Sequence, residues 1–84
     1  MRVPLERPKR PPWLCHEHHI FNKSGVRKQS EKYNCVIYVS PDYHRFIHEN
    51  AALRKDLKAK YQQMLEDAGW TREEFRETFG KSYL

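Results

Sequence analysis

All five histidines of the chain lie in two short segments, and this distribution constrains the fold more than any other feature of the sequence. Three of them fall in the stretch CHEHHIF at residues 15–21, and the other two are His44 and His48. Histidine is the commonest metal-ligating side chain and the one whose charge changes near neutral pH. The sequence therefore predicts a fold that brings residues 15–21 against the segment around His44 and His48.

The apolar core of so short a chain is marginal. Of the 84 residues only 38% are hydrophobic, the mean hydropathy is −1.01, and a domain of this size removes only about 60% of its unfolded surface from water. Such domains usually need disulfides, a metal ion or a partner subunit. Cys15 and Cys35 allow at most one disulfide, and we find neither a signal peptide nor an apolar run that could span a membrane. We expect a reduced, cytoplasmic protein stabilised by a metal ion.

The excess positive charge lies entirely in the half of the chain that holds the histidines. Residues 1–48 contain nine lysines and arginines against four acidic residues, whereas residues 49–84 contain seven of each. This asymmetry favours a polyanionic partner, most simply a nucleic acid, although a solvated basic surface has the same composition.

The first half of the chain reads as an arm followed by two strands. Residues 1–12 alternate four prolines with basic residues, which predicts a flexible, extended arm. A short strand is expected within residues 15–21, followed by a polar loop over residues 22–34. The β-branched and aromatic run CVIYV at 35–39 is the clearest strand, and Cys35 at its start is expected to be a small buried hydrophobe.

The second half predicts three helices. The dipeptide Ser-Pro at 40–41 is typical of a helix start, and Asn50 is a candidate point of interruption. A longer amphipathic helix covers residues 51–68, and the capping-box sequence TREE at 71–74 begins a last short one. The aromatic side chains are expected to supply most of the core, namely Trp13, Tyr38, Phe46, Tyr61, Trp70, Phe75 and Phe79.

The spacing of the histidines indicates two roles. His44 and His48 are four residues apart in a predicted helix, so both rings lie on one face, one turn apart, and can bind a single ion. His18 and His19 are neighbours in a predicted strand, where successive side chains point to opposite faces. They cannot both bind the same ion in a regular strand. One of them can bind the metal while the other lies beside it and moves a proton.

This arrangement resembles the HNH, or ββα-metal, nuclease family. The stretch EHHI at 17–20 resembles the first strand of that family, and His44-x-x-x-His48 resembles the ligands on its helix. Residues 13–84 as a whole resemble small phage-type HNH proteins that end in a similar FGKxYL tail. The resemblance implies an α+β fold with a ββα-metal core over residues 13–50 and two supporting helices in residues 51–84. Many such relatives hold a second, structural zinc with Cys-x-x-Cys pairs, which this chain lacks.

The resemblance also implies site residues and an activity. It assigns the ligands of one divalent metal ion to His18, His44 and His48. His19 corresponds to the general base that activates water, and Asn34 is the best candidate for the residue that orients this base, ahead of Asn22. The implied activity is hydrolysis of DNA phosphodiester bonds, by nicking or cutting, in the cytoplasm of a bacterial or phage-infected cell.

The residue types suit this chemistry. A neutral imidazole with a pKa near ~6.5 can take a proton from water at physiological pH, and a three-histidine metal site leaves positions open for phosphate oxygens. Histidine ligation favours Zn²⁺, Ni²⁺ or Mn²⁺ over Mg²⁺. The candidates for phosphate contacts are Arg27, Lys28 and Arg45, and Arg45 is preferred because it adjoins a predicted ligand.

A structural zinc site is the main alternative. Cys15-x-x-His18 and His44-x-x-x-His48 together supply four ligands at zinc-finger-like spacings. A metal closed by four protein groups does no chemistry. The protein would then be a catalytically silent, metal-stabilised module that binds nucleic acid or a protein partner, for example a small phage-encoded inhibitor. A homodimer is open under either interpretation.

Overall fold

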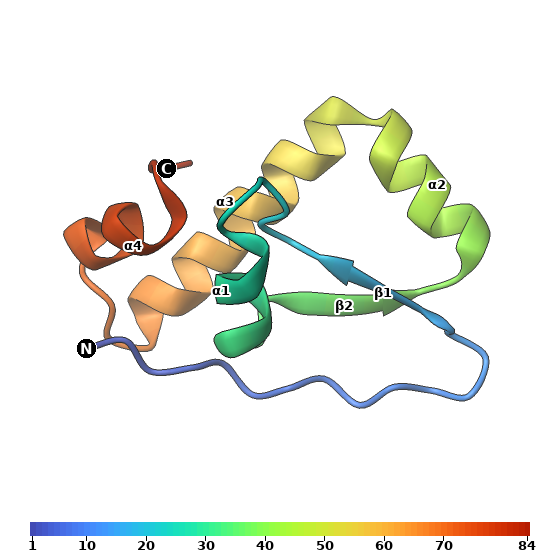
Figure 1. The fold of residues 1–84 in the computed structure, drawn as a ribbon, viewed down its shortest axis with the longest axis horizontal. Helices are drawn as coiled ribbons and strands as arrows, with labels where there is room; N and C mark the ends of the chain where they lie inside the picture. Colours follow the sequence, from blue (N-terminus) through green and yellow to red (C-terminus); the bar gives the residue numbers. More distant parts are fainter.

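The structure, a computed structural model, describes all residues from Met1 to Leu84 and has the expected α+β class. It contains one two-stranded antiparallel sheet and four helices (Figure 1). The elements follow in the order β1 (His16–His19), α1 (Arg27–Lys32), β2 (Val36–Val39), α2 (Pro41–Glu49), α3 (Ala51–Asp67) and α4 (Arg72–Phe79). The two strands and the three later helices match the sequence-based expectation, whereas α1 lies in a segment that was expected to be a loop.

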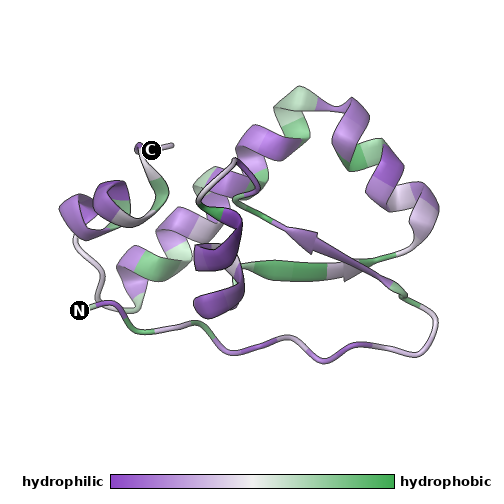
Figure 2. Ribbon diagram, in the orientation of Figure 1, coloured by the Kyte–Doolittle hydropathy of each residue, from purple (hydrophilic) through white to green (hydrophobic).

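The register of the sheet divides the side chains of β1 between two surroundings. His18 lies opposite Ile37, and His19 lies opposite Val36. Side chains alternate along a strand, so His16 and His18 approach α2 while Glu17 and His19 approach α1. Figure 2 shows a contrast between the two strands, since β1 is hydrophilic and β2 is largely hydrophobic.

A single buried serine holds α1 in place. The Ser30 hydroxyl accepts a hydrogen bond from the Phe21 backbone N–H at 3.0 Å and donates one to the Phe21 carbonyl at 2.7 Å. The Ser30 carbonyl in turn accepts from the Cys35 N–H at 2.8 Å. These bonds tie the polar segment between the strands to the core, which explains why it folds although it has no apolar periodicity.

Polar caps define the later helices, as the sequence predicts. The Ser40 side chain accepts from the Tyr43 N–H at the start of α2. Asn50 ends α2 and begins α3, because its side chain accepts from the Leu53 N–H at 2.9 Å. Thr71 and Glu74 form the expected capping box of α4, which ends at Gly80.

The hydrophobic core lies at the end of the molecule formed by α3 and α4. Its eight buried members are Ile20, Phe21, Tyr33, Cys35, Leu65, Trp70, Phe75 and Phe79. Cys35 is buried as expected, and burial raises the pKa of its thiol to about 12. Two aromatic residues expected in the core are exposed instead, since Trp13 is 76% and Phe46 is 51% accessible. Trp13 precedes β1 and Phe46 lies on the outer face of α2, beyond the reach of this core.

The N-terminal arm is extended, but it contacts the domain rather than standing free. The Leu5 N–H donates to the Tyr33 carbonyl at 3.0 Å, and the Trp70 indole N–H donates to the Val3 carbonyl at 2.8 Å. Arg7 adds four side-chain hydrogen bonds further along. Residues 1–12 thus form an extended arm that contacts the domain, and Figure 1 shows its path past α1 and the sheet.

Replacing Ser30 by alanine is expected to destabilise the protein by about 1–3 kcal/mol, because two buried backbone groups of Phe21 would lose their partner. Urea unfolding measures this loss. Ser24→Ala is the matched control, since Ser24 is exposed in the same segment and its loss should change the free energy of unfolding by less than about 0.5 kcal/mol. Equal stability of the two variants would contradict the anchoring role of Ser30.

Candidate metal centre

Three histidine side chains converge between β1 and α2. Nitrogen atoms of His18, His44 and His48 all lie within 4.8 Å of one another and could hold a metal ion. The Nε2 atoms of His44 and His48 are 3.0 Å apart, and the His18 ring lies 5.3 and 5.4 Å from their ring centroids. The strand supplies one donor and successive turns of the helix supply two, so the convergence that the sequence predicts is present.

The electrostatics of this cluster suit a cation. Burial, followed by the neighbouring His44 and His48, lowers the pKa of His18 to about 4, and its side chain is only 3% exposed. Burial, followed by His48 and His16, also lowers the pKa of His44. Metal ligation requires neutral imidazoles. The lowered pKa values of His18 and His44 therefore favour the neutral imidazoles that a metal ion would need.

The end of α2 is fixed independently of the ring contacts. The Arg54 guanidinium, from the first turn of α3, donates to the carbonyls of Ile47 and His48. These carbonyls belong to the last turn of α2, and the Ile47 carbonyl also accepts from the Asn50 N–H at 3.1 Å. Arg54 and the Asn50 cap together hold the turn that carries His48.

His16 joins the cluster, although the sequence analysis gives it no role. Its Nδ1 lies 3.0 Å from Nδ1 of His44, and the two rings are edge to face. A metal-ligating histidine usually shares its second ring nitrogen with such a partner, which fixes its tautomer. The signal was available in the sequence, because His16 and His18 are two residues apart in a strand and share a face.

Cys15 does not take part in this cluster. It is a free, exposed cysteine immediately before β1 and lies outside the group of converging donor atoms. The four-ligand zinc site considered above, with Cys15 as its fourth ligand, is therefore not formed in this structure. The reason is positional, because Cys15 and His18 are three positions apart along an extended chain, and an odd offset places the two side chains on opposite faces.

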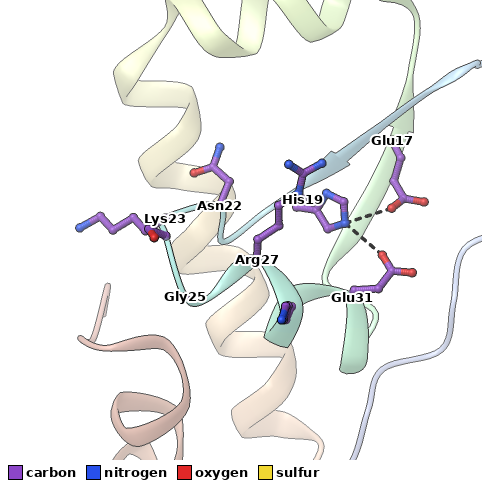
Figure 3. A pocket seen from close by; sticks show the side chains of 9 residues that line it. Glu17, His19, Asn22, Lys23, Gly25, Arg27 and Glu31 are labelled. Atoms are coloured by element: carbon purple, nitrogen blue, oxygen red, sulfur yellow. Dashed lines mark hydrogen bonds and ion pairs between the residues drawn. The ribbon is translucent and has the colours of Figure 1, made fainter.

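His19 lies between two carboxylates. Its Nε2 is 3.0 Å from Oε1 of Glu17 and 3.0 Å from Oε2 of Glu31 (Figure 3). The hydrogen bond from His19, followed by contacts with Glu17 and Arg7, lowers the pKa of Glu31. An ionised carboxylate only accepts hydrogen bonds. Nε2 must therefore carry a proton to donate to them, which leaves Nδ1 as the only ring nitrogen that could accept one.

A cavity of about 340 Å³ brings His19 and the metal cluster together. Its lining consists of Glu17, His18, His19, Asn22, Arg27, His44 and His48. A second cavity of about 940 Å³ shares four of these residues and extends along the segment between the strands. No hydrophobic residue lines either cavity, so both are suited to a polar or charged ligand. The last residue of β1 thus reaches the cavity beside the three histidines.

The hydrogen bonds of Asn34 go to the N-terminal arm and not to His19, the base that it was expected to orient. Its Nδ2 donates to the Leu5 carbonyl at 2.8 Å, and its Oδ1 accepts from Arg7 at 3.3 Å. Asn34 lies just beyond the end of α1 and has a left-handed backbone conformation, with φ 61°. Its side chain bonds the arm. The side chains that contact His19 are the carboxylates Glu17 and Glu31. Glu17 is close to His19 in sequence and a role as such a partner was open to it, whereas nothing in the sequence points to Glu31. Asn22 lines both cavities.

The three predicted phosphate contacts differ in position. Arg27 lines both cavities and Lys28 lines the larger one. Arg45 is exposed on α2 and lines neither of them. Residues one apart in a helix project about 100° from each other, so Arg45 does not share the direction of His44.

Comparisons with protein-family models, with curated proteins and with solved structures find no match to this chain. A search for membrane-crossing segments finds no helix with the length and apolar character required. The assignment of function therefore rests on the geometry of the site.

Metal-free protein is expected to lose stability as the pH falls from about 6.5 to about 4. The pKa of His18 is about 4 in the folded state against an ordinary value of 6.5, so the unfolded chain binds more protons throughout this window and folding weakens. The loss from His18 amounts to at most about 3 kcal/mol. Urea unfolding of chelator-treated protein at several pH values measures it. His18→Gln should flatten the slope, and an unchanged slope would contradict the assignment.

Proposed function

We propose that the protein is a metal-dependent endonuclease of the HNH type that hydrolyses phosphodiester bonds in DNA. The observation that carries this proposal is the cavity that brings His19 beside the converging nitrogens of His18, His44 and His48. The order of β1, β2 and α2 is compatible with a ββα-metal core, with α3 and α4 as its support.

Each group in the cavity can be given a step in this chemistry. A divalent ion bound to the three histidines would act as a Lewis acid on the phosphate and the leaving oxygen. Nδ1 of His19 accepts the proton of the attacking water, and the ring becomes cationic. Glu17 and Glu31 stabilise that cation through Nε2. Arg27, at the junction of the two cavities, holds a phosphate oxygen.

The charge distribution supports DNA as the substrate. The larger cavity continues from His19 along the segment that carries Lys23, Arg27 and Lys28. A strand of DNA could follow this basic segment while its scissile phosphate lies in the smaller cavity. Contacts of this kind to phosphates carry little sequence information, so a single copy is expected to cut with weak sequence preference.

One observation favours the alternative, a metal-stabilised module without catalytic activity. Glu17 and Glu31 present carboxylates to the same cavities in which a phosphate would bind, and like charges repel. In such a module the histidines would stabilise the fold, and the basic segment would contact nucleic acid or a protein partner. The two functions differ in whether His19 is needed for an activity or is only a neighbour of the metal site.

Plasmid relaxation by purified protein in Mg²⁺, Mn²⁺, Ni²⁺ or Zn²⁺ tests the proposal. His19→Ala should lower the cleavage rate roughly 10²- to 10⁴-fold, because a general base is lost, while the stoichiometry of bound metal stays unchanged. Cys15→Ala is the control and should leave both properties intact. No relaxation by wild-type protein with any ion would favour the silent module, and equal rates for wild type and His19→Ala would reject the assigned base.

A matched pair of arginine variants tests the phosphate contact. Arg27→Ala should weaken DNA binding. It should also reduce the magnitude of the slope of log affinity against log salt concentration by about 1, which is the contribution of one phosphate contact. Arg45→Ala should have a smaller effect, because Arg45 lies outside both cavities. Binding of a labelled duplex at several salt concentrations measures both variants. A larger loss in Arg45→Ala would place the DNA on the outer face of α2 instead.

A further inference from the structure

Arg7 of the N-terminal arm bonds both carboxylates that surround His19. Its Nη2 donates to Oε2 of Glu17 at 2.8 Å, and its Nη1 donates to Oε1 of Glu31 at 2.9 Å. The same guanidinium donates to the Tyr38 hydroxyl and to the Asn34 side chain, each at 3.3 Å. One side chain of the arm therefore contacts residues of β1, α1 and β2.

Arg7, Glu17, His19 and Glu31 form a closed ring of three hydrogen bonds and one ion-pair contact, the last between His19 and Glu17. Each carboxylate uses one oxygen for Arg7 and its other oxygen for Nε2 of His19. Two carboxylates directed at one nitrogen repel each other, and the positive charge of Arg7 offsets this repulsion. The planar guanidinium also fixes the directions of both bonds, which an ammonium group does not. The ring of His19 is thus held from two sides through groups that Arg7 holds in turn.

We propose that Arg7 is a positioning residue that acts through Glu17 and Glu31 to hold His19 in one orientation with its proton on Nε2. This leaves Nδ1 as the nitrogen that accepts a proton. The catalytic consequence rests on the proposed nuclease function, whereas the orientation and tautomer of His19 do not. The N-terminal arm is then a part of the site, although it lines neither cavity.

A second metal site is the competing interpretation of these residues. Donor atoms of Glu17, His19 and Glu31 lie within 4.8 Å of one another. Arg7 already provides a cation to both carboxylates, and a divalent ion placed among them would lie close to that positive charge. The structure therefore favours the guanidinium as the permanent partner of this pair.

Three variants separate the positioning role from a structural one. Arg7→Met removes the guanidinium, Arg7→Lys keeps the charge without the planar fork, and Glu31→Gln disrupts the ring from α1 without altering the arm. Arg10→Met is the matched control, because Arg10 lies in the same arm and donates only to the backbone carbonyls of Leu14 and Cys15. Urea unfolding checks that each variant is folded under the assay conditions.

The kinetic readout is cleavage of a short duplex in the metal that supports activity best. Arg7→Met and Glu31→Gln should lower kcat roughly 10- to 100-fold, as expected for a displaced reacting group, with KM and metal stoichiometry little changed. Arg7→Lys should recover only part of the rate, and Arg10→Met should match wild type. A wild-type kcat in Arg7→Met would overturn the proposal, as would an equal loss in Arg10→Met.

The second readout is independent of activity. Nitrogen-15 shifts of the His19 ring should report a single tautomer with the proton on Nε2 in wild type, and a mixture of tautomers in Arg7→Met and Glu31→Gln. If wild type cuts no DNA, the nuclease assignment fails while this result still supports the positioning role. An unchanged single tautomer in Arg7→Met overturns the proposal. Loss of a second bound equivalent of Ni²⁺ in Glu31→Gln would also overturn it in favour of a metal site.

Discussion

The alternation of side chains along β1 is the constraint on which the site depends. Four consecutive residues, His16 to His19, divide into two pairs because β1 is a regular strand in antiparallel register with β2. His16 and His18 meet the histidines of α2, while Glu17 and His19 meet α1 and the arm. A slip of one residue would exchange the two surroundings and place the Glu17 carboxylate toward the histidines of α2. The buried residues of β2 and the segment after β1 oppose such a slip.

The apolar core and the site occupy different parts of this small domain. Phe21, Phe75, Phe79 and Trp70 belong to the core beside α3 and α4, whereas no hydrophobic residue lines the cavities. Burial of His18 disfavours its charged form, so folding is less favourable at a pH where the unfolded chain would protonate this ring. An ion bound there would turn this cost into stabilisation, because binding to the folded state alone favours folding. Stability at this end and catalysis would then depend on the same three side chains.

The sequence reveals the local parts of this structure and misses the parts that depend on distant contacts. The caps at Ser40, Asn50 and Thr71 and the four-residue spacing of His44 and His48 are short-range signals, and they predict the helices and half of the cluster. The helix α1 was not predicted, because its anchor is the Ser30 side chain, which bonds the backbone of Phe21 nine residues away. The roles of Glu31 and Arg7 were not predicted either. Glu31 contacts His19, and Arg7 contacts the carboxylates beside it, only once α1 and the arm have packed against the sheet. Asn34 was selected by analogy of position, and its actual bonds to the arm have no local signature.

The proline content of the arm helps to explain how twelve residues with little to bury can occupy a defined place. Proline restricts the unfolded chain to conformations close to the extended one seen here, so less conformational entropy is lost when the arm docks. A few directed bonds then suffice, and most come from Arg7, the backbone of Leu5 and the carbonyl of Val3. The composition that indicated a free tail is therefore also suited to a strap. What distinguishes the two is whether a partner exists for the arginine, and in this fold the pair of carboxylates beside His19 supplies it.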